Sequence, residues 1–131
     1  MEIIDKYTKE LENDTELNML NLRDVQMRLP ALKHKWVARL INHKIELNKA
    51  KSLIIKAKET IIEKQLSTCK ITMSRSSLEK NAEKHDTVIR LKTKVKEEEF
   101  TIMYLEKVEQ IFKSMTFDVK NLTEILKLEQ L

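Results

Sequence analysis

The sequence predicts an all-α protein, on the basis of its glycine content, its charge content and the spacing of its apolar residues. The 131 residues include no glycine and one proline, although about 7% glycine is average. Tight hairpins and phosphate-binding loops depend on glycine, because they need positive φ or a backbone without Cβ. Charged residues make up 35% of the chain, which is typical of long solvated helices. We therefore expect a long antiparallel helical hairpin with short N- and C-terminal helices.

We expect a single helical domain over residues 1–131, whose N-terminal segment, 1–29, holds a short helix and a linker. Apolar residues from Ile3 to Leu11 recur at helical spacing, so a helix over residues 2–12 should end near Asn13. Pro30 suits the first turn of the next helix, where its missing N–H would have no partner.

Residues 30–66 are predicted to form one long basic helix with a continuous apolar seam. Its seam residues alternate in steps of four and three: Trp36, Leu40, His43, Leu47, Ala50, Ile54, Ala57 and Ile61. Further apolar residues widen this seam: Val37, Ile41, Ile55 and Ile62. A helix on the order of 50 Å long cannot bury such a stripe alone. We therefore expect it to pack against a second helix and against copies of the same chain, in a homo-oligomeric bundle.

Residues 67–85 are predicted to form a loop or hinge, and residues 86–131 a second long helix followed by a short one. Hydroxyl and β-branched side chains interrupt the helical period after Leu66, and Ser76 with Glu79 fits a capping box. Asp86 is the expected cap of the second long helix, whose seam residues are Val88, Leu91, Val95, Ile102, Leu105 and Phe112. Glu98 interrupts that seam, which predicts looser packing or a polar partner. Thr116 is the expected cap of a separate final helix.

The sequence contains no arrangement that predicts an enzyme, a metal site or a cofactor. Its three histidines are scattered, and none stands at metal-ligand spacing with cysteine or carboxylate. The single cysteine, Cys69, cannot form an intramolecular disulfide, and the N-terminus lacks the pattern of a signal peptide. No apolar stretch approaches the roughly 20 residues that span a bilayer. We therefore expect a cytoplasmic, non-enzymatic protein without a membrane segment.

Positive charge is concentrated in the middle of the chain. Residues 31–66 carry nine basic and three acidic side chains, and residues 67–96 carry eight and three, whereas acidic residues are in excess at both ends. A basic centre of this kind predicts binding to a polyanion. Trp36 begins the seam and is interpreted as a core residue rather than a base-stacking one. The binding should therefore follow a phosphate backbone, depend on salt and discriminate little between bases.

Two other interpretations of the basic segment remain open. The chain could be a structural coiled-coil scaffold without nucleic-acid binding, whose lysines only keep it soluble. It could also lie on anionic membranes as a basic amphipathic helix, but the apolar face is patterned as a seam and lacks an aromatic insertion edge.

Several motifs, in order along residues 15–131, resemble the tailed-phage recombination mediator family UvsY. Residues 33–36 (KHKW) resemble the family's Ser-Lys-Trp entry to its first long helix, and residues 55–59 (IKAKE) resemble its Leu-Lys-Ala-Arg-Glu DNA-binding signature. Residues 88–91 and 104–106 are similar to its second long helix, and residues 113–122 (KSMTFDVKNL) to its closing motif. The chain departs from the family where Lys58 replaces an arginine, Ile61 and Ile62 replace paired aromatics, and Thr116 replaces a glycine. The resemblance is that of a divergent member.

The resemblance implies a recombination mediator that binds single-stranded DNA and helps a RecA-like recombinase to load onto DNA coated with single-strand-binding protein. It implies a ring-like homo-oligomer of about six or seven subunits, in the cytoplasm of a host cell. Phosphate contact is assigned to Lys56 and Lys58, with neighbouring turns contributing Lys49, Lys51 and Lys64. Oligomerisation is assigned to the C-terminal region, through Leu105, Phe112, Phe117, Leu122 and Leu126.

Overall fold

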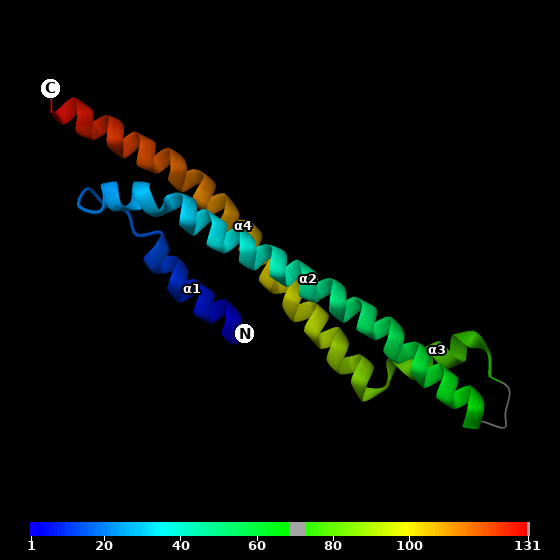
Figure 1. Cartoon of the computed structure of the whole chain (residues 1–131). Coiled ribbons are helices and arrows are strands. Elements are labelled where there is room, and N and C mark those ends of the chain that lie inside the picture. The colour runs from blue at the N-terminus through cyan, green and yellow to red at the C-terminus, as the bar shows by residue number, and fades with distance from the viewer. Residues whose placement is uncertain (69–72, 131) are drawn as a thin grey trace. The chain divides into compact units, whose positions relative to one another are not determined.

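The computed structural model describes residues 1–68 and 73–130, and within these ranges the chain forms α-helices and no strand (Figure 1). The helices are α1 (Glu2–Asp14), α2 (Leu22–Thr68), α3 (Arg75–Glu83) and α4 (Asp86–Glu129). The all-α prediction is confirmed, and α1 ends where the sequence predicted. Cys69 and Leu131 lie outside the described residues. The chain divides into two compact units: unit 1 comprises Met1–Asn42 and Thr101–Leu131, and unit 2 comprises His43–Phe100.

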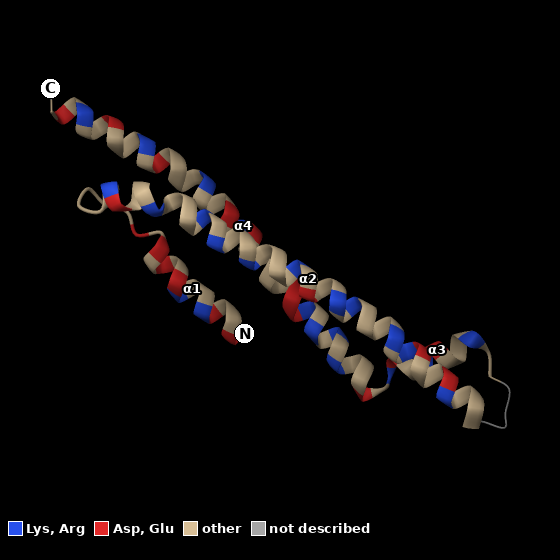
Figure 2. Cartoon of the chain, in the orientation of Figure 1, with Lys and Arg blue, Asp and Glu red and all other residues tan. Residues whose placement is uncertain are grey.

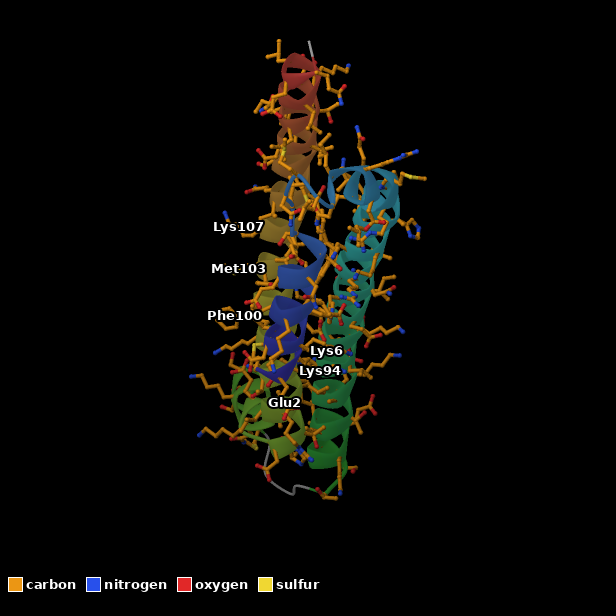
Figure 3. All side chains as sticks on the ribbon, turned by 90° about the vertical axis from the view of Figure 1, so that its left-hand side faces the viewer. Glu2, Lys6, Lys94, Phe100, Met103 and Lys107 are labelled. Carbon is orange, nitrogen blue, oxygen red and sulfur yellow. The ribbon has the colours of Figure 1, made fainter. Side chains whose placement is uncertain are left out.

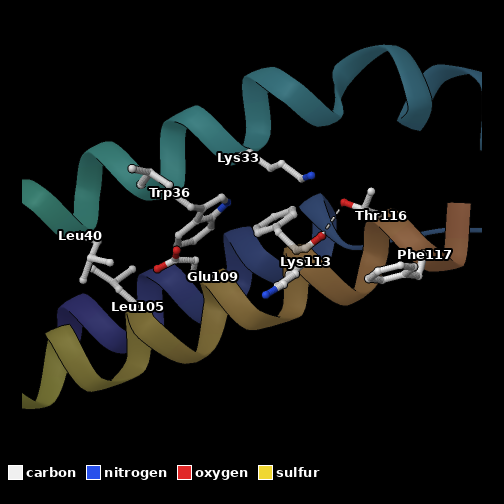
Figure 4. A pocket seen from close by; sticks show the side chains of 10 residues that line it. Lys33, Trp36, Leu40, Leu105, Glu109, Lys113, Thr116 and Phe117 are labelled. Atoms are coloured by element: carbon white, nitrogen blue, oxygen red, sulfur yellow. Dashed lines mark hydrogen bonds between the residues drawn. The ribbon is translucent and has the colours of Figure 1, made fainter.

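Unit 1 is built on an antiparallel pairing of α2 with α4 (Figures 1 and 4). The buried residues of α2 recur at steps of three or four: Leu22, Val25, Leu29, Leu32, Trp36 and Leu40. The buried residues of α4 follow the same spacing: Ile102, Leu105, Val108, Phe112, Met115 and Val119. The spacing of both rows matches the helical period, so each helix presents one apolar stripe to the other.

The predicted helix start at Pro30 is wrong, because α2 begins at Leu22 and contains Pro30. Leu29 and Leu32 are buried on either side of this proline, so the seam continues through it. A proline inside a helix costs about 3 kcal/mol and removes one backbone hydrogen bond. Burial of the four apolar residues from Leu22 to Leu32 outweighs that cost, since each contributes about 1.5–3 kcal/mol.

Within unit 1, helix α1 packs around Trp36. Trp36 is 2% exposed, as its interpretation as a core residue predicted. The Tyr7 ring meets the Trp36 ring edge-on at 5.6 Å, and Trp36 Nε1 donates a hydrogen bond to Asp14 Oδ2 at 2.9 Å. The Arg39 guanidinium lies 4.7 Å from both ring centroids and 2.7 Å from Glu10 Oε2. Its proximity holds the pKa of the Glu10 carboxyl below its ordinary value of 4.5. Aromatic and ionic contacts therefore attach a helix too short to be stable alone.

Unit 2 contains a polar pair at the place where both seams are interrupted. His43 Nδ1 lies 2.6 Å from Glu98 Oε2, and both side chains are about 15% exposed. This contact confirms the polar partner that Glu98 predicted. The other residues of the α2 seam from Leu47 to Ile61 are buried or half-buried. A polar pair inside an apolar seam is satisfied in one register of the helices, so it selects that register.

Helix α3 occupies part of the segment predicted as a loop. Its N-cap is Ser74, whose Oγ accepts a hydrogen bond from Ser77 N at 3.2 Å, so the predicted cap at Ser76 is wrong by two residues. Both residues belong to a run of hydroxyl side chains, and each could offer the same cap chemistry. Leu78 and Ala82 of α3 pack against Ile62, which places this short helix on the end of α2.

The predicted separate C-terminal helix is also wrong, because α4 runs without a break from Asp86 to Glu129. Thr116 lies inside it and donates its Oγ1 hydrogen to the Phe112 carbonyl oxygen at 3.1 Å. A threonine satisfied by the preceding turn does not need to end the helix. The buried residues Met115 and Val119 continue the seam past this position.

The polar pair of unit 2 leads to a stability prediction. Glu98→Ala leaves His43 half-buried without its carboxylate, and we expect the free energy of unfolding to fall by about 1.5 kcal/mol. His43→Leu combined with Glu98→Leu should restore most of it, because the seam becomes apolar. Urea unfolding at one protein concentration measures both effects, with Glu99→Ala as the exposed control. Equal stability of Glu98→Ala and wild type would contradict the role of the pair.

Candidate nucleic-acid interface

The net positive charge of the chain resides in unit 2. This unit carries 14 basic and 9 acidic side chains, whereas unit 1 carries 11 and 12. Figure 2 shows lysine and arginine recurring along the second half of α2 and along the first turns of α4. The electrostatic attraction for a polyanion is therefore expected from unit 2, and the two helices share it.

The predicted lysines lie on more than one side of α2. Successive residues of a helix are rotated by about 100°, so Lys51 and Lys58, seven residues apart, share one side. Lys49 and Lys56 share a nearly opposite side, where they border a shallow groove with Ile45 and Leu53. The structure therefore separates Lys56 from Lys58, since residues two apart on a helix do not face each other.

Lys64 lies apart from both rows. It borders a small groove with Ala57 and Ile61 of α2 and with His85 and Thr87 at the start of α4. His85 Nδ1 accepts a hydrogen bond from Thr87 N at 3.3 Å and so caps α4, a role that the sequence had assigned to Asp86. Asp86 is the first residue of the helix instead.

On the Lys58 side, two lysines converge on one carboxylate. Lys58 Nζ lies 3.1 Å from Glu83 Oε1, and Lys92 Nζ lies 3.6 Å from the same oxygen. Glu83 is the last residue of α3, and Lys92 is on α4, so three helices contribute to this cluster. The Lys58 ammonium, with the positive charge of Lys92, holds the pKa of the Glu83 carboxyl below its ordinary value. One negative charge thus balances only half of the positive charge.

On the Lys49 side of α2, the carboxylate of Glu46 also lies near two lysines. Its carboxylate lies 3.5 Å from Lys49 Nζ and 3.9 Å from Lys94 Nζ. Glu46 and Lys49 are three residues apart on one helix, so the helix itself brings these two side chains to neighbouring positions.

Sequence reasoning missed the basic residues of α4 as candidate contacts. Lys92 shares the Glu83 carboxylate with Lys58 of α2. Lys94 shares the Glu46 carboxylate with Lys49 of α2. The signal was present in the excess of eight basic over three acidic residues across positions 67–96. That excess does not indicate which of these lysines face α2, because the answer depends on the register of the two helices.

The predicted assembly residues lie in two environments of unit 1. Leu105 and Phe112 are buried in the chain's own core, whereas Phe117 is 62% exposed and Leu122 and Leu126 are half-buried. Leu105, Phe112 and Phe117 nevertheless line one apolar groove of about 390 Å³ between α2 and α4. Figure 4 shows Trp36 and Leu40 on the α2 side of the groove and Phe117 toward one end of it.

The outer surface of α4 also carries exposed apolar side chains. Met103 is 60% exposed and lies with Lys107 on the side of α4 that faces away from α2 (Figure 3). Met103 does not line the groove. It therefore offers a comparison for the effect of Phe117, which is equally exposed and on the same helix.

Within residues 1–68 and 73–130, no group of three or more His, Cys, Asp or Glu side chains is arranged to hold a metal ion. None of the helices described has a stretch both long and apolar enough to cross a bilayer.

No protein-family model matches the chain, and no curated protein matches it. Solved structures do. Crystal structures of the bacteriophage T4 recombination mediator protein UvsY have a similar fold, one of them with a TM-score of 0.77 at 14% identity over 95% of this chain and 97% of that one. Two further lattice types of the same protein give TM-scores of 0.73 and 0.71 at 14% and 15% identity, over 97% and 93% of this chain. At these identities the similarity shows the fold, and it confirms the fold that the sequence motifs predicted.

Proposed function

We propose that this chain is a recombination mediator that binds single-stranded DNA without sequence preference and promotes loading of a RecA-like recombinase. The observation that carries the proposal is the fold it shares with the T4 mediator over nearly the whole of both chains. The proposed substrate is DNA coated with single-strand-binding protein. The role needs no catalytic group, since it consists of holding and transferring a strand.

The charge of unit 2 supports DNA binding. Lysines that neutralise phosphates release condensed counterions, so binding is favourable and salt-dependent without any contact to bases. Among the predicted contacts, Lys49, Lys51, Lys56 and Lys64 are exposed and available to a strand. Lys58 is half-buried, and its ammonium group lies beside the half-exposed Glu83 carboxylate. Aromatic stacking has little part in the proposal, because Trp36 is buried.

The two rows of lysines lead to a salt-titration prediction. Lys56→Ala combined with Lys58→Ala should weaken binding of a single-stranded oligonucleotide. If each lysine neutralises one phosphate, the slope of log affinity against log salt should decrease by about 1.4. Fluorescence anisotropy over a sodium chloride series measures both quantities.

The matched control is Lys120→Ala combined with Lys127→Ala, which removes two exposed positive charges from unit 1. It should leave the slope unchanged. A slope unaffected by Lys56→Ala with Lys58→Ala would remove both residues from the interface. No salt-sensitive binding by the wild type would favour the alternative function, a coiled-coil scaffold.

We further propose that copies of the chain assemble into a ring through unit 1. Phe117 is exposed and lines the groove of about 390 Å³, whereas Leu122 and Leu126 are half-buried on another side of the last turns of α4. Leu105 and Phe112 are buried and line that groove, so their part in assembly is to shape it. A ring presents several basic units to one strand, and many weak phosphate contacts then give high avidity.

The assembly proposal is tested at Phe117. Phe117→Ala should lower the mass measured by light scattering, because it removes an exposed side chain from the edge of the groove. Its thermal unfolding should change little, since that side chain is mostly solvated. Met103→Ala, at an equally exposed position outside the groove, should keep the wild-type mass. Equal masses for the Phe117 variant and the wild type would exclude Phe117 from the assembly surface.

A further inference from the structure

The cluster of Lys58, Lys92 and Glu83 has the charge and geometry of an occupied anion site. Both ammonium groups lie within 3.6 Å of one carboxylate oxygen. A phosphodiester carries the same single negative charge as a carboxylate and also accepts hydrogen bonds through oxygen. The side chains remain accessible, with exposed fractions of 26% for Lys58, 45% for Lys92 and 49% for Glu83. A phosphate could therefore take the place of the Glu83 carboxylate.

Helix α3, which carries Glu83, is attached to the rest of unit 2 by a small apolar contact. It has nine residues, and isolated helices below about 12 residues are marginal in water. Its buried side chains are Leu78 and Ala82, which pack on Ile62 with Ile61 and Met73 partly covered beside them. Such a contact contributes a small part of the stability of a unit, so α3 is suited to local release.

The Glu46 cluster lacks this property, although its charges are the same. Glu46 lies on α2 beside Lys49, so its backbone cannot move away from Lys49 unless α2 itself unfolds. Glu83 lies on a different helix from both of its lysines. Of these two clusters, the Glu83 cluster is therefore the one that combines two lysines from the long helices with a carboxylate that can move away as part of a separate element.

We infer that Lys58 and Lys92 form one site for a DNA phosphate, that Glu83 occupies it in the free protein, and that binding of the strand displaces Glu83 together with α3. The inference rests on the proposed DNA binding and adds to it a contact on α4 and a control element. Lys51 lies one heptad before Lys58 on the same side of α2, so a strand that follows this side reaches the site.

The test measures binding of a fluorescent oligothymidylate to the full-length protein by anisotropy over a salt series. Glu83→Gln removes the competing charge, and we expect affinity to rise about two- to fivefold at low salt, the range of one exposed ion pair. Lys92→Ala should lower affinity and reduce the salt slope by about 0.7, the value for one single-strand phosphate. Glu83→Gln added to Lys92→Ala should give a smaller gain than it gives alone.

Two further variants separate displacement of α3 from a general effect of charge. Glu46→Gln changes net charge as Glu83→Gln does, and it should raise affinity less. Leu78→Ala loosens α3 without changing any charge, and it should raise affinity about twofold or more at low salt, in the range that Glu83→Gln gives. Circular dichroism checks that Leu78→Ala is folded, and if it is not, the Glu83 and Lys92 variants still decide the question.

The outcomes distinguish this inference from the proposed function. If the wild type binds DNA with a steep salt slope but Glu83→Gln and Lys92→Ala bind like the wild type, the inference is overturned and the proposed function stands. Equal gains for Glu83→Gln and Glu46→Gln, or a folded Leu78→Ala that binds no better than wild type, would overturn displacement of α3. A wild type that binds no DNA would overturn both.

Discussion

Burial of the apolar seams of α2 and α4 is the constraint on which the rest of the structure depends. Neither helix can leave its stripe in water, and the sequence has no glycine, the residue that most often ends a helix. Trp36 extends this burial to α1, because its ring contacts the Tyr7 ring and its Nε1 donates a hydrogen bond to Asp14, and both partners belong to α1. In unit 2 the pair of His43 and Glu98 selects one register for the two helices.

The register of the seams also determines which charged side chains meet. Lysines seven residues apart form rows on the two sides of α2, because the heptad spacing that aligns the seam also aligns its flanks. The basic residues of α4 then lie beside these rows, and Glu83 and Glu46 each bridge from one helix to another. Packing and polyanion binding are therefore not separate properties of the long helices, since the first arranges the groups that perform the second.

The seam of α2 between Trp36 and Ile61 and the polar position at Glu98 could be predicted from spacing alone. The seam from Leu22 to Leu32 could not, because Pro30 is a strong local signal for a helix start and only the buried surface in unit 1 overrides it. The prediction at Thr116 was wrong because its hydroxyl can either cap a helix or donate a hydrogen bond to the preceding turn inside a helix. For the site, the lysines of α2 were predictable from charge, but the partnership of Lys58 with Lys92 depends on where α3 and α4 fold.

The central claim is that single-stranded DNA lies along the basic side chains of unit 2. Lysine acetylation footprinting by mass spectrometry, with and without an oligothymidylate, tests it directly in the full-length protein. We expect the DNA to protect Lys51, Lys58 and Lys92 from acetylation, and to leave Lys120 and Lys127 of unit 1 as reactive as before. Equal protection of the lysines of both units, or protection confined to unit 1, would contradict the account.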